Sequence, residues 1–265
     1  VTFQVTRYRR FPGFEYQSTA EASFDAWIKY YRHNENTPNS TISYYLKGSI
    51  IAFFLDLDIL EATGGKHRLD DVMRDLYREH YLEKFDGFTY DSVVKTAERY
   101  MGKNLEEFFR TYVYGTTDMP FEEYFKKVGL ELKTADPDDE SMKKGNLGVR
   151  VRMKEHRPYV AIVRRDSAAQ EAGIQPQDEI VAMDGLRVFT AGDFTGRLEN
   201  MKPGDTVEVT LARQNELKTV TATLGEPVPV KYKSKPVENP TDEQKEMFKL
   251  WTGYEIDTLD SDKDC

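Results

Sequence analysis

The chain has 265 residues, of which 39% are hydrophobic and 31% charged, and this composition is typical of a soluble globular protein with more than one domain. Its formal net charge of −9 argues against nucleic-acid binding, which depends on clustered Lys and Arg. The single cysteine, Cys265, excludes an intrachain disulfide, and no apolar run reaches the roughly 18 residues that a membrane span needs.

Residues 18–132 carry the apolar periodicity of helices. Near the start of this stretch, four large side chains recur at the spacing of one helical face, and this spacing predicts a stripe buried in the core. These side chains are Phe24, Trp27, Ile28 and Tyr31.

The following helix, expected over residues 42–62, is apolar on nearly all sides, so we expect it at the centre of a helical domain. Gly64 and Gly65 suit a left-handed cap at its end. Further helices are expected near residues 69–77, 90–100, 104–115 and 120–129.

Residues 134–144 are acidic, contain a proline and almost lack apolar side chains, which predicts a linker. After them, β-branched segments near residues 147–151, 159–163, 179–183, 206–211 and 219–224 predict strands, with short helices near 168–172 and 191–201. We therefore expect a small, partly open β-barrel with two helices. In the tail, an amphipathic piece at residues 242–251 is expected to dock back on the protein and the last few residues to be loose.

The predicted architecture is a multidomain α plus β protein. Residues 1–133 form an all-α domain, residues 134–144 a linker, residues 145–226 the small β-barrel, and residues 227–265 a partly docked tail.

The second domain carries a specific set of short motifs. They are Leu-Gly-Val at residues 147–149, Ser-Ala-Ala at 167–169, Ala-Gly-Ile at 172–174, and Asp-Glu-Ile-Val-Ala-Met-Asp-Gly at 178–185. In this order they resemble a PDZ domain of the bacterial protease-associated type over residues 145–224. The resemblance implies a groove for peptides or protein C-termini, with an unpaired strand edge and backbone amides for the terminal carboxylate. The candidate binding residues are Asn146, Leu147, Gly148, Val149, Phe194 and Leu198; the alternative is that these side chains are only core and that the protein's own tail fills the groove.

The helical domain contains Tyr-Leu-Lys-Gly at residues 45–48. This pattern, together with residues 17–27, 42–48, 55–57, 63–66 and 69–74, is similar to the glycyl aminopeptidase family of the gluzincin class, which also carries a C-terminal PDZ domain. The resemblance covers nearly the whole chain. It implies a zinc-dependent aminopeptidase in which Tyr45 donates a hydrogen bond to the oxyanion formed from the scissile carbonyl.

The zinc ligands of such an enzyme are not expected in this chain. A zincin places two His one helical turn apart in His-Glu-x-x-His, and no two of His33, His67, His80 and His156 have that spacing. We expect the zinc motif upstream of Val1, no metal site in this chain, and no hydrolysis by the fragment alone. The alternative is that the natural protein has itself lost the zinc motif, in which case the same ligands would be missing.

A non-catalytic PDZ protein that binds peptides or acts as a scaffold is the alternative function, and a purely structural fragment is a third. In these interpretations Tyr44 and Tyr45 are core aromatics. Lys47 receives no chemical role in either case. The helical domain is expected to expose apolar surface, which favours a homodimer of the fragment. The compartment stays open between cytoplasm and periplasm.

Overall fold

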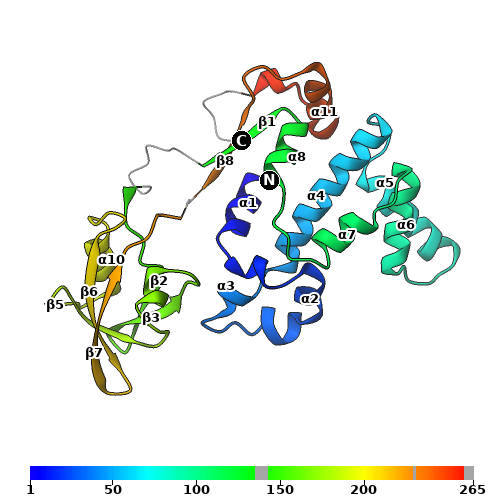
Figure 1. Cartoon of the computed structure of the whole chain (residues 1–265). Helices are drawn as coiled ribbons and strands as arrows, with labels where there is room; N and C mark the ends of the chain where they lie inside the picture. The colour runs from blue at the N-terminus through cyan, green and yellow to red at the C-terminus, as the bar shows by residue number, and fades with distance from the viewer. Residues whose placement is uncertain (135–142, 229–230, 260–265) are drawn as a thin grey trace.

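The computed structural model describes residues 1–134, 143–228 and 231–259. A helical region comes first, a β domain (residues 145–224) follows, and residues 231–259 return to the helical region (Figure 1). The predicted fold class, an all-α part followed by a PDZ-like β domain, is confirmed. None of the helices in the described part of the chain combines the length and apolar character that a membrane crossing needs.

The helical region consists of short helices around one long one. The long helix is α4, and the others precede or follow it along the chain. Their bounds are α1 Thr2–Arg9, α2 Thr19–Phe24, a π-helical turn Ala26–Tyr30, α3 Thr37–Ser40, α4 Tyr44–Thr63, α5 Leu69–Leu76, a second π-helical turn Tyr77–Glu83, α6 Tyr90–Met101, α7 Glu106–Tyr112 and α8 Phe121–Lys127.

Helix α4 is buried on two sides. Ile50, Phe54 and Leu57 lie in one hydrophobic cluster with α1 and α8, whereas Leu55 and Ile59 lie in a second cluster with α5, α6 and α7. The Ser43 hydroxyl caps its start by accepting a hydrogen bond from the amide of Leu46, and Gly64, with φ of 56°, ends it in the left-handed conformation. The prediction of a central helix ended by glycine is confirmed.

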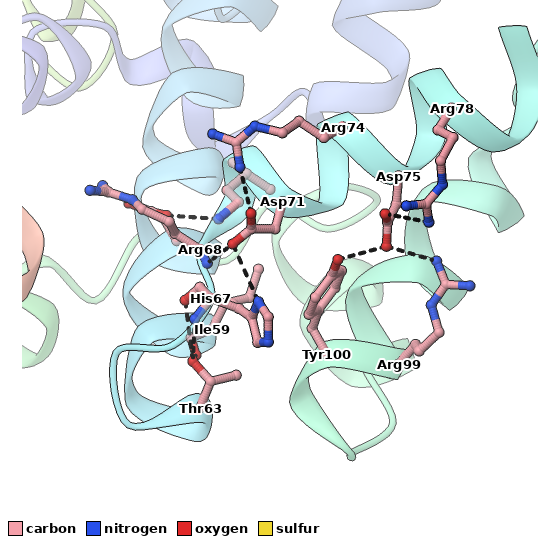
Figure 2. Close-up of polar contacts among 12 residues, drawn as sticks. Ile59, Thr63, His67, Arg68, Asp71, Arg74, Asp75, Arg78, Arg99 and Tyr100 are labelled. Carbon is pink, nitrogen blue, oxygen red and sulfur yellow. Dashed lines mark hydrogen bonds and ion pairs between the residues drawn. The ribbon is translucent and has the colours of Figure 1, made fainter. Parts of the chain in front are cut away.

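Polar side chains fasten the surrounding helices. The Asp58 carboxylate of α4 accepts hydrogen bonds from the Tyr124 hydroxyl and from the Lys127 amine of α8, both at 2.8 Å. Figure 2 shows a second network, in which Asp75 of α5 accepts from Tyr100 and Arg99 of α6. Because these carboxylates are satisfied by partners from other helices, they fix how the helices pack.

The predicted buried stripe is wrong. Phe24, Trp27, Ile28 and Tyr31 are between 52% and 89% exposed. The face that packs inward carries Ala22 and Ala26, which are also four residues apart. In addition, residues 26–30 form a π-helical turn, so a period of 3.6 residues does not describe this segment.

Lys47 lies inside the core of the helical region. Its side chain is 0% exposed, and its amine donates a hydrogen bond to the carbonyl oxygen of Gly115 at 3.2 Å. Burial lowers the pKa of Lys47 to about 8.

The β domain is a six-stranded antiparallel sheet with two helices. The strand order is β2-β3-β4-β6-β7, with β5 paired to β4, so β2 is an edge strand. Its elements are β2 Val149–Lys154, β3 Arg157–Val163, α9 Ala168–Glu171, β4 Glu179–Met183, β5 Leu186–Arg187, α10 Ala191–Leu198, β6 Thr206–Arg213 and β7 Glu216–Thr223.

The C-terminal segment packs on the helical region. Strand β8 (Tyr232–Pro236) pairs antiparallel with β1 (Leu130–Thr134) (Figure 1). Helix α11 (Asp242–Thr252) places Trp251 against Phe53, with ring centroids 5.2 Å apart. The strands β1 and β8 were not predicted. Residues 135–142 of the expected linker and the last residues, 260–265, lie outside the described residues.

The buried side-chain amide of Asn39 helps to join the helical region to the β domain. The Asn39 side chain, only 6% exposed, donates to the carbonyl oxygen of Val163 at 2.7 Å and accepts from the amide of Arg165 at 2.9 Å. The Arg165 guanidinium also lies 3.9 Å from the centroid of the Tyr16 ring. The two parts therefore meet at the end of β3.

Replacing Lys47 by methionine is expected to stabilise the chain at pH 7 and to lose that effect in base. Because the pKa of Lys47 is lower in the folded than in the unfolded state, the unfolded chain binds more protons between about pH 8 and pH 10.5. The cost of burying the charged amine therefore applies in full below pH 8 and disappears above pH 10.5. We expect Lys47→Met to raise the free energy of unfolding by about 2 kcal/mol at pH 7. Denaturant titrations of both proteins at pH 7 and pH 10 measure it; a difference that is the same at both values contradicts the assignment.

Candidate functional site

Tyr45 stands at the exposed start of α4. It is the second residue of the helix and is 59% exposed. Its hydroxyl oxygen lies 3.3 Å from that of Tyr31, which in turn lies 3.4 Å from that of Tyr44. The rings of Tyr44 and Tyr45 are 4.2 Å apart, and Tyr30 meets both edge-on. Four tyrosines thus form one cluster outside the core.

The hydrogen bonds in this cluster shift the pKa values of two hydroxyls in opposite directions. The bond to Tyr31, and after it the bond to Tyr44, lower the pKa of Tyr45 below its usual value. The separate hydrogen bond between Tyr31 and Tyr44 raises the pKa of Tyr44. Tyr45 is therefore the better hydrogen-bond donor toward an oxygen that gains negative charge.

The tyrosine cluster continues into a larger apolar surface. We call the exposed side chains of Phe24, Trp27, Ile28, Tyr31 and Tyr45 the aromatic face. Trp27 and Tyr31 pack on each other, with ring centroids 5.2 Å apart. Large exposed apolar side chains close together in the sequence are typical of an interaction surface or of the wall of a ligand-binding cleft.

The four residues Tyr-Leu-Lys-Gly divide between core and surface. Leu46 and Lys47 are buried, whereas Tyr45 is exposed. A side chain added at Gly48 would meet no atom within 4 Å, so nothing in the described chain requires glycine there. Glycine inside a helix costs about 1 kcal/mol relative to alanine, and open space beside it permits close approach by another group.

A metal ion has no set of ligands in the described part of the chain. Residues 1–134, 143–228 and 231–259 contain no group of three or more His, Asp, Glu or Cys placed to hold one. His67 is 3.5 Å from Asp71 (Figure 2). His80 is 3.1 Å from Asp86, and neither pair has a third ligand among the described residues. Zinc therefore does not fit these residues.

The second candidate site is a groove between β2 and α10. The six candidate residues, Asn146, Leu147, Gly148, Val149, Phe194 and Leu198, all line one pocket of about 140 Å³ at its end. Phe194 is 1% exposed and also belongs to the domain core, so it forms the floor, while Leu198 is half-buried. Whether a peptide binds them stays a prediction.

The loop at the end of this groove presents backbone amides. Gly148 has φ of 81°, and a side chain there would lie 2.2 Å from Ser167, so the loop requires glycine. The Gly148 amide donates to the Asn146 side chain at 2.9 Å. The backbone amide of Arg164 donates to the carbonyl oxygen of Gly148 at 2.8 Å, which makes Val149 and Val163 a non-hydrogen-bonded pair. The Val149 amide therefore points to the free edge. An anion at this edge would meet that amide.

The sequence reasoning identified Tyr45 but missed its partners. Tyr31 was assigned to a buried stripe and Tyr30 was given no role, yet the structure brings both to Tyr44 and Tyr45. The available signal was the repetition of Tyr-Tyr at residues 30–31 and 44–45, on either side of one loop.

Comparisons with known proteins give separate matches for the helical region and for the β domain. Residues 1–51 match the M61 glycyl aminopeptidase family, and residues 145–224 match the PDZ domain, the name used below for the β domain. A solved structure of an aminopeptidase N family protein from Idiomarina loihiensis is 31% identical, with a TM-score of 0.77 over 92% of this chain and 43% of that one.

Two curated proteins match over shorter stretches. A candidate zinc metalloprotease of Mesorhizobium japonicum is 47% identical over 66 residues, 25% of this chain and 18% of that protein. The serine protease Do-like HtrB of Bacillus subtilis is 29% identical over 111 residues, 42% of this chain and 23% of that protein. The chain thus spans less than half the length of each of these relatives.

Removing the Tyr31 hydroxyl is expected to shift two neighbouring pKa values in opposite directions. Tyr31→Phe deletes both the bond that lowers the pKa of Tyr45 and the bond that raises the pKa of Tyr44. The pKa of Tyr45 should therefore rise toward 10, and that of Tyr44 should fall toward 10. NMR titration of ¹³C-labelled tyrosine measures both. Tyr254→Phe, at a distant exposed tyrosine, serves as the control, and equal shifts of the same sign would contradict the network.

Proposed function

We propose that the chain combines the C-terminal region of an M61 glycyl aminopeptidase with a PDZ domain, and that it supplies one wall of the active-site cleft of a zinc-dependent aminopeptidase. In the intact enzyme the zinc ligands come from residues other than those described here, since these contain no metal-binding cluster. Zinc there would polarise the scissile carbonyl and activate water. This chain alone is then inactive.

Tyr45 is the residue to which we assign the chemistry in this chain. It is exposed, it belongs to a rigid helix, and its hydrogen bonds to Tyr31 and Tyr44 lower its pKa. A neutral phenol with a lowered pKa donates a hydrogen bond that strengthens as the carbonyl oxygen of the substrate becomes an oxyanion. The exposed tyrosine cluster is the observation that supports this assignment.

We assign the aromatic face and Gly48 to the part of the cleft wall that surrounds Tyr45. The aromatic face is apolar and exposed, and it contains Tyr45 itself. We propose that the catalytic part of the enzyme covers this face, which excludes water from the Tyr45 hydroxyl. In the isolated chain the same surface is available for homodimer formation.

The PDZ groove is the second working part of this proposal. It has a free edge strand, a loop that presents amides, and an apolar pocket between Leu147, Phe194 and Leu198. An extended peptide that adds to β2 gains main-chain hydrogen bonds, and its terminal carboxylate meets the loop. Peptides or protein C-termini are therefore the proposed partners.

One observation favours a second candidate function, a non-catalytic peptide-binding or scaffold protein. The pocket of the groove is lined by residues from 144–149 and 194–199 alone, whereas the described residues hold no metal cluster. In that case the helical region only supports the PDZ domain, and Tyr45 has no catalytic role.

Tyr45→Phe in the full-length enzyme with zinc is expected to lower kcat by about 100-fold, because one donor to the oxyanion is lost. The measurement is hydrolysis of glycyl and alanyl 4-nitroanilides, with Tyr254→Phe as a matched control that should keep full activity. An unchanged rate for Tyr45→Phe overturns the assignment. No hydrolysis by the full-length protein favours the scaffold function.

The chain as it stands is expected to bind C-terminal peptides through the groove. Amidation of the terminal carboxylate should weaken binding at least tenfold, since a charge-assisted hydrogen bond is lost. Leu198→Ser, in the pocket, should also weaken binding, while Leu217→Ser, on an exposed position of β7, should not. Fluorescence anisotropy with labelled decapeptides measures this; no binding across a diverse set contradicts the proposal.

A further inference from the structure

A basic cavity of about 560 Å³ lies where the helical region meets the PDZ domain. The helical region contributes Arg7 and Arg10 to its lining, and the PDZ side contributes Lys144, Arg150 and Arg164. Among the described residues that line the cavity, none is acidic. Five cationic groups around one space make it attractive to an anion.

Several of these charges lack a counter-ion within the described chain. Among residues 1–134, 143–228 and 231–259, no ion pair involves Arg7, Arg150 or Arg164. Arg164 is half-buried, and burial lowers its pKa. A partly desolvated guanidinium without an anion is unfavourable, so a ligand carboxylate placed beside it would be stabilised.

The basic cavity and the groove share one wall. The residues Lys144, Gly145, Asn146, Gly148 and Val149 line both. Beyond this loop, β2 alternates: Val149 and Val151 pack toward the core of the PDZ domain, and Arg150 lies on the opposite face beside Ile162, its partner on β3. Ile162 and Arg150 both line the basic cavity.

A peptide added to β2 would follow the same alternation. When the side chain of its last residue enters the pocket between β2 and α10, the side chain of the penultimate residue points to the opposite face. That face is the one that carries Arg150 and opens into the basic cavity.

Resting on the proposed peptide-binding function, we propose that the basic cavity receives the carboxylate side chain of the penultimate ligand residue. The ligands preferred by the groove are peptides that end in an acidic residue followed by a small apolar residue with a free carboxylate. Because the cavity takes arginines from both parts of the chain, a bound ligand also bridges the helical region and the PDZ domain.

The test uses the whole chain and labelled decapeptides of one sequence that end in Ala-Asp-Val or Ala-Asn-Val, each with a free or an amidated C-terminus. The Asp peptide is expected to bind about tenfold more tightly than the Asn peptide at low salt, and the ratio should fall as salt is added. In the double variant Arg150→Gln, Arg164→Gln the two peptides should bind equally. Lys218→Gln, which removes one charge from the distant strand β7, should retain the preference.

The outcomes separate the two proposals. If both free peptides bind, amidation weakens both and the Asp and Asn peptides bind equally, the acidic preference is overturned and the groove function survives. A preference that survives in the double variant also overturns it. If no peptide binds and amidation has no effect, the peptide-binding function fails and the inference fails with it. If inorganic phosphate displaces the Asn peptide as well as the Asp peptide, the effect is general screening and the cavity assignment is wrong.

Discussion

The burial of α4 on two sides is the constraint on which the helical region depends. One side of this helix packs against α1 and α8 and the other against α5, α6 and α7, so neither cluster can form without it. Because hydrophobic clusters on both sides fix its rotation, the helix also fixes what its first turn presents to solvent. Lys47 must point inward and Tyr45 outward. The position of the candidate catalytic hydroxyl is thus determined by apolar packing along the rest of the helix.

The join between the two parts of the chain works through hydrogen bonds to backbone. Asn39 binds the backbone at the end of β3 with both ends of its amide, which fixes the position of that strand more strictly than an apolar contact would. Asn39 also lines the basic cavity. The same residue therefore holds Arg7 and Arg10 near Arg150 and Arg164, and the cavity depends on this join.

The sequence predicted those features whose causes are local. Helix α4 follows from an apolar run ended by glycine, and the PDZ domain follows from short motifs in order. The strands β1 and β8 were missed because their pairing joins segments about 100 residues apart, and Tyr-Lys-Ser-Lys-Pro has little strand periodicity. The basic cavity was missed for the same reason, since its arginines come from three separate segments.

The aromatic stripe was predicted wrongly for a different reason, and its exposure bears on the function of the chain. Apolar periodicity shows which side chains share a helical face, but not whether that face is buried. Ala22 and Ala26 have the same four-residue spacing, and it is their face that packs into the core. Burying a large aromatic side chain typically contributes about 1.5–3 kcal/mol, which this chain forgoes at Phe24 and Trp27. The stability of the described fold therefore does not explain these residues, whereas a surface that covers them does. Such a cover would lower the local dielectric around the Tyr45 hydroxyl, and a hydrogen bond to a developing oxyanion is strongest where water is excluded.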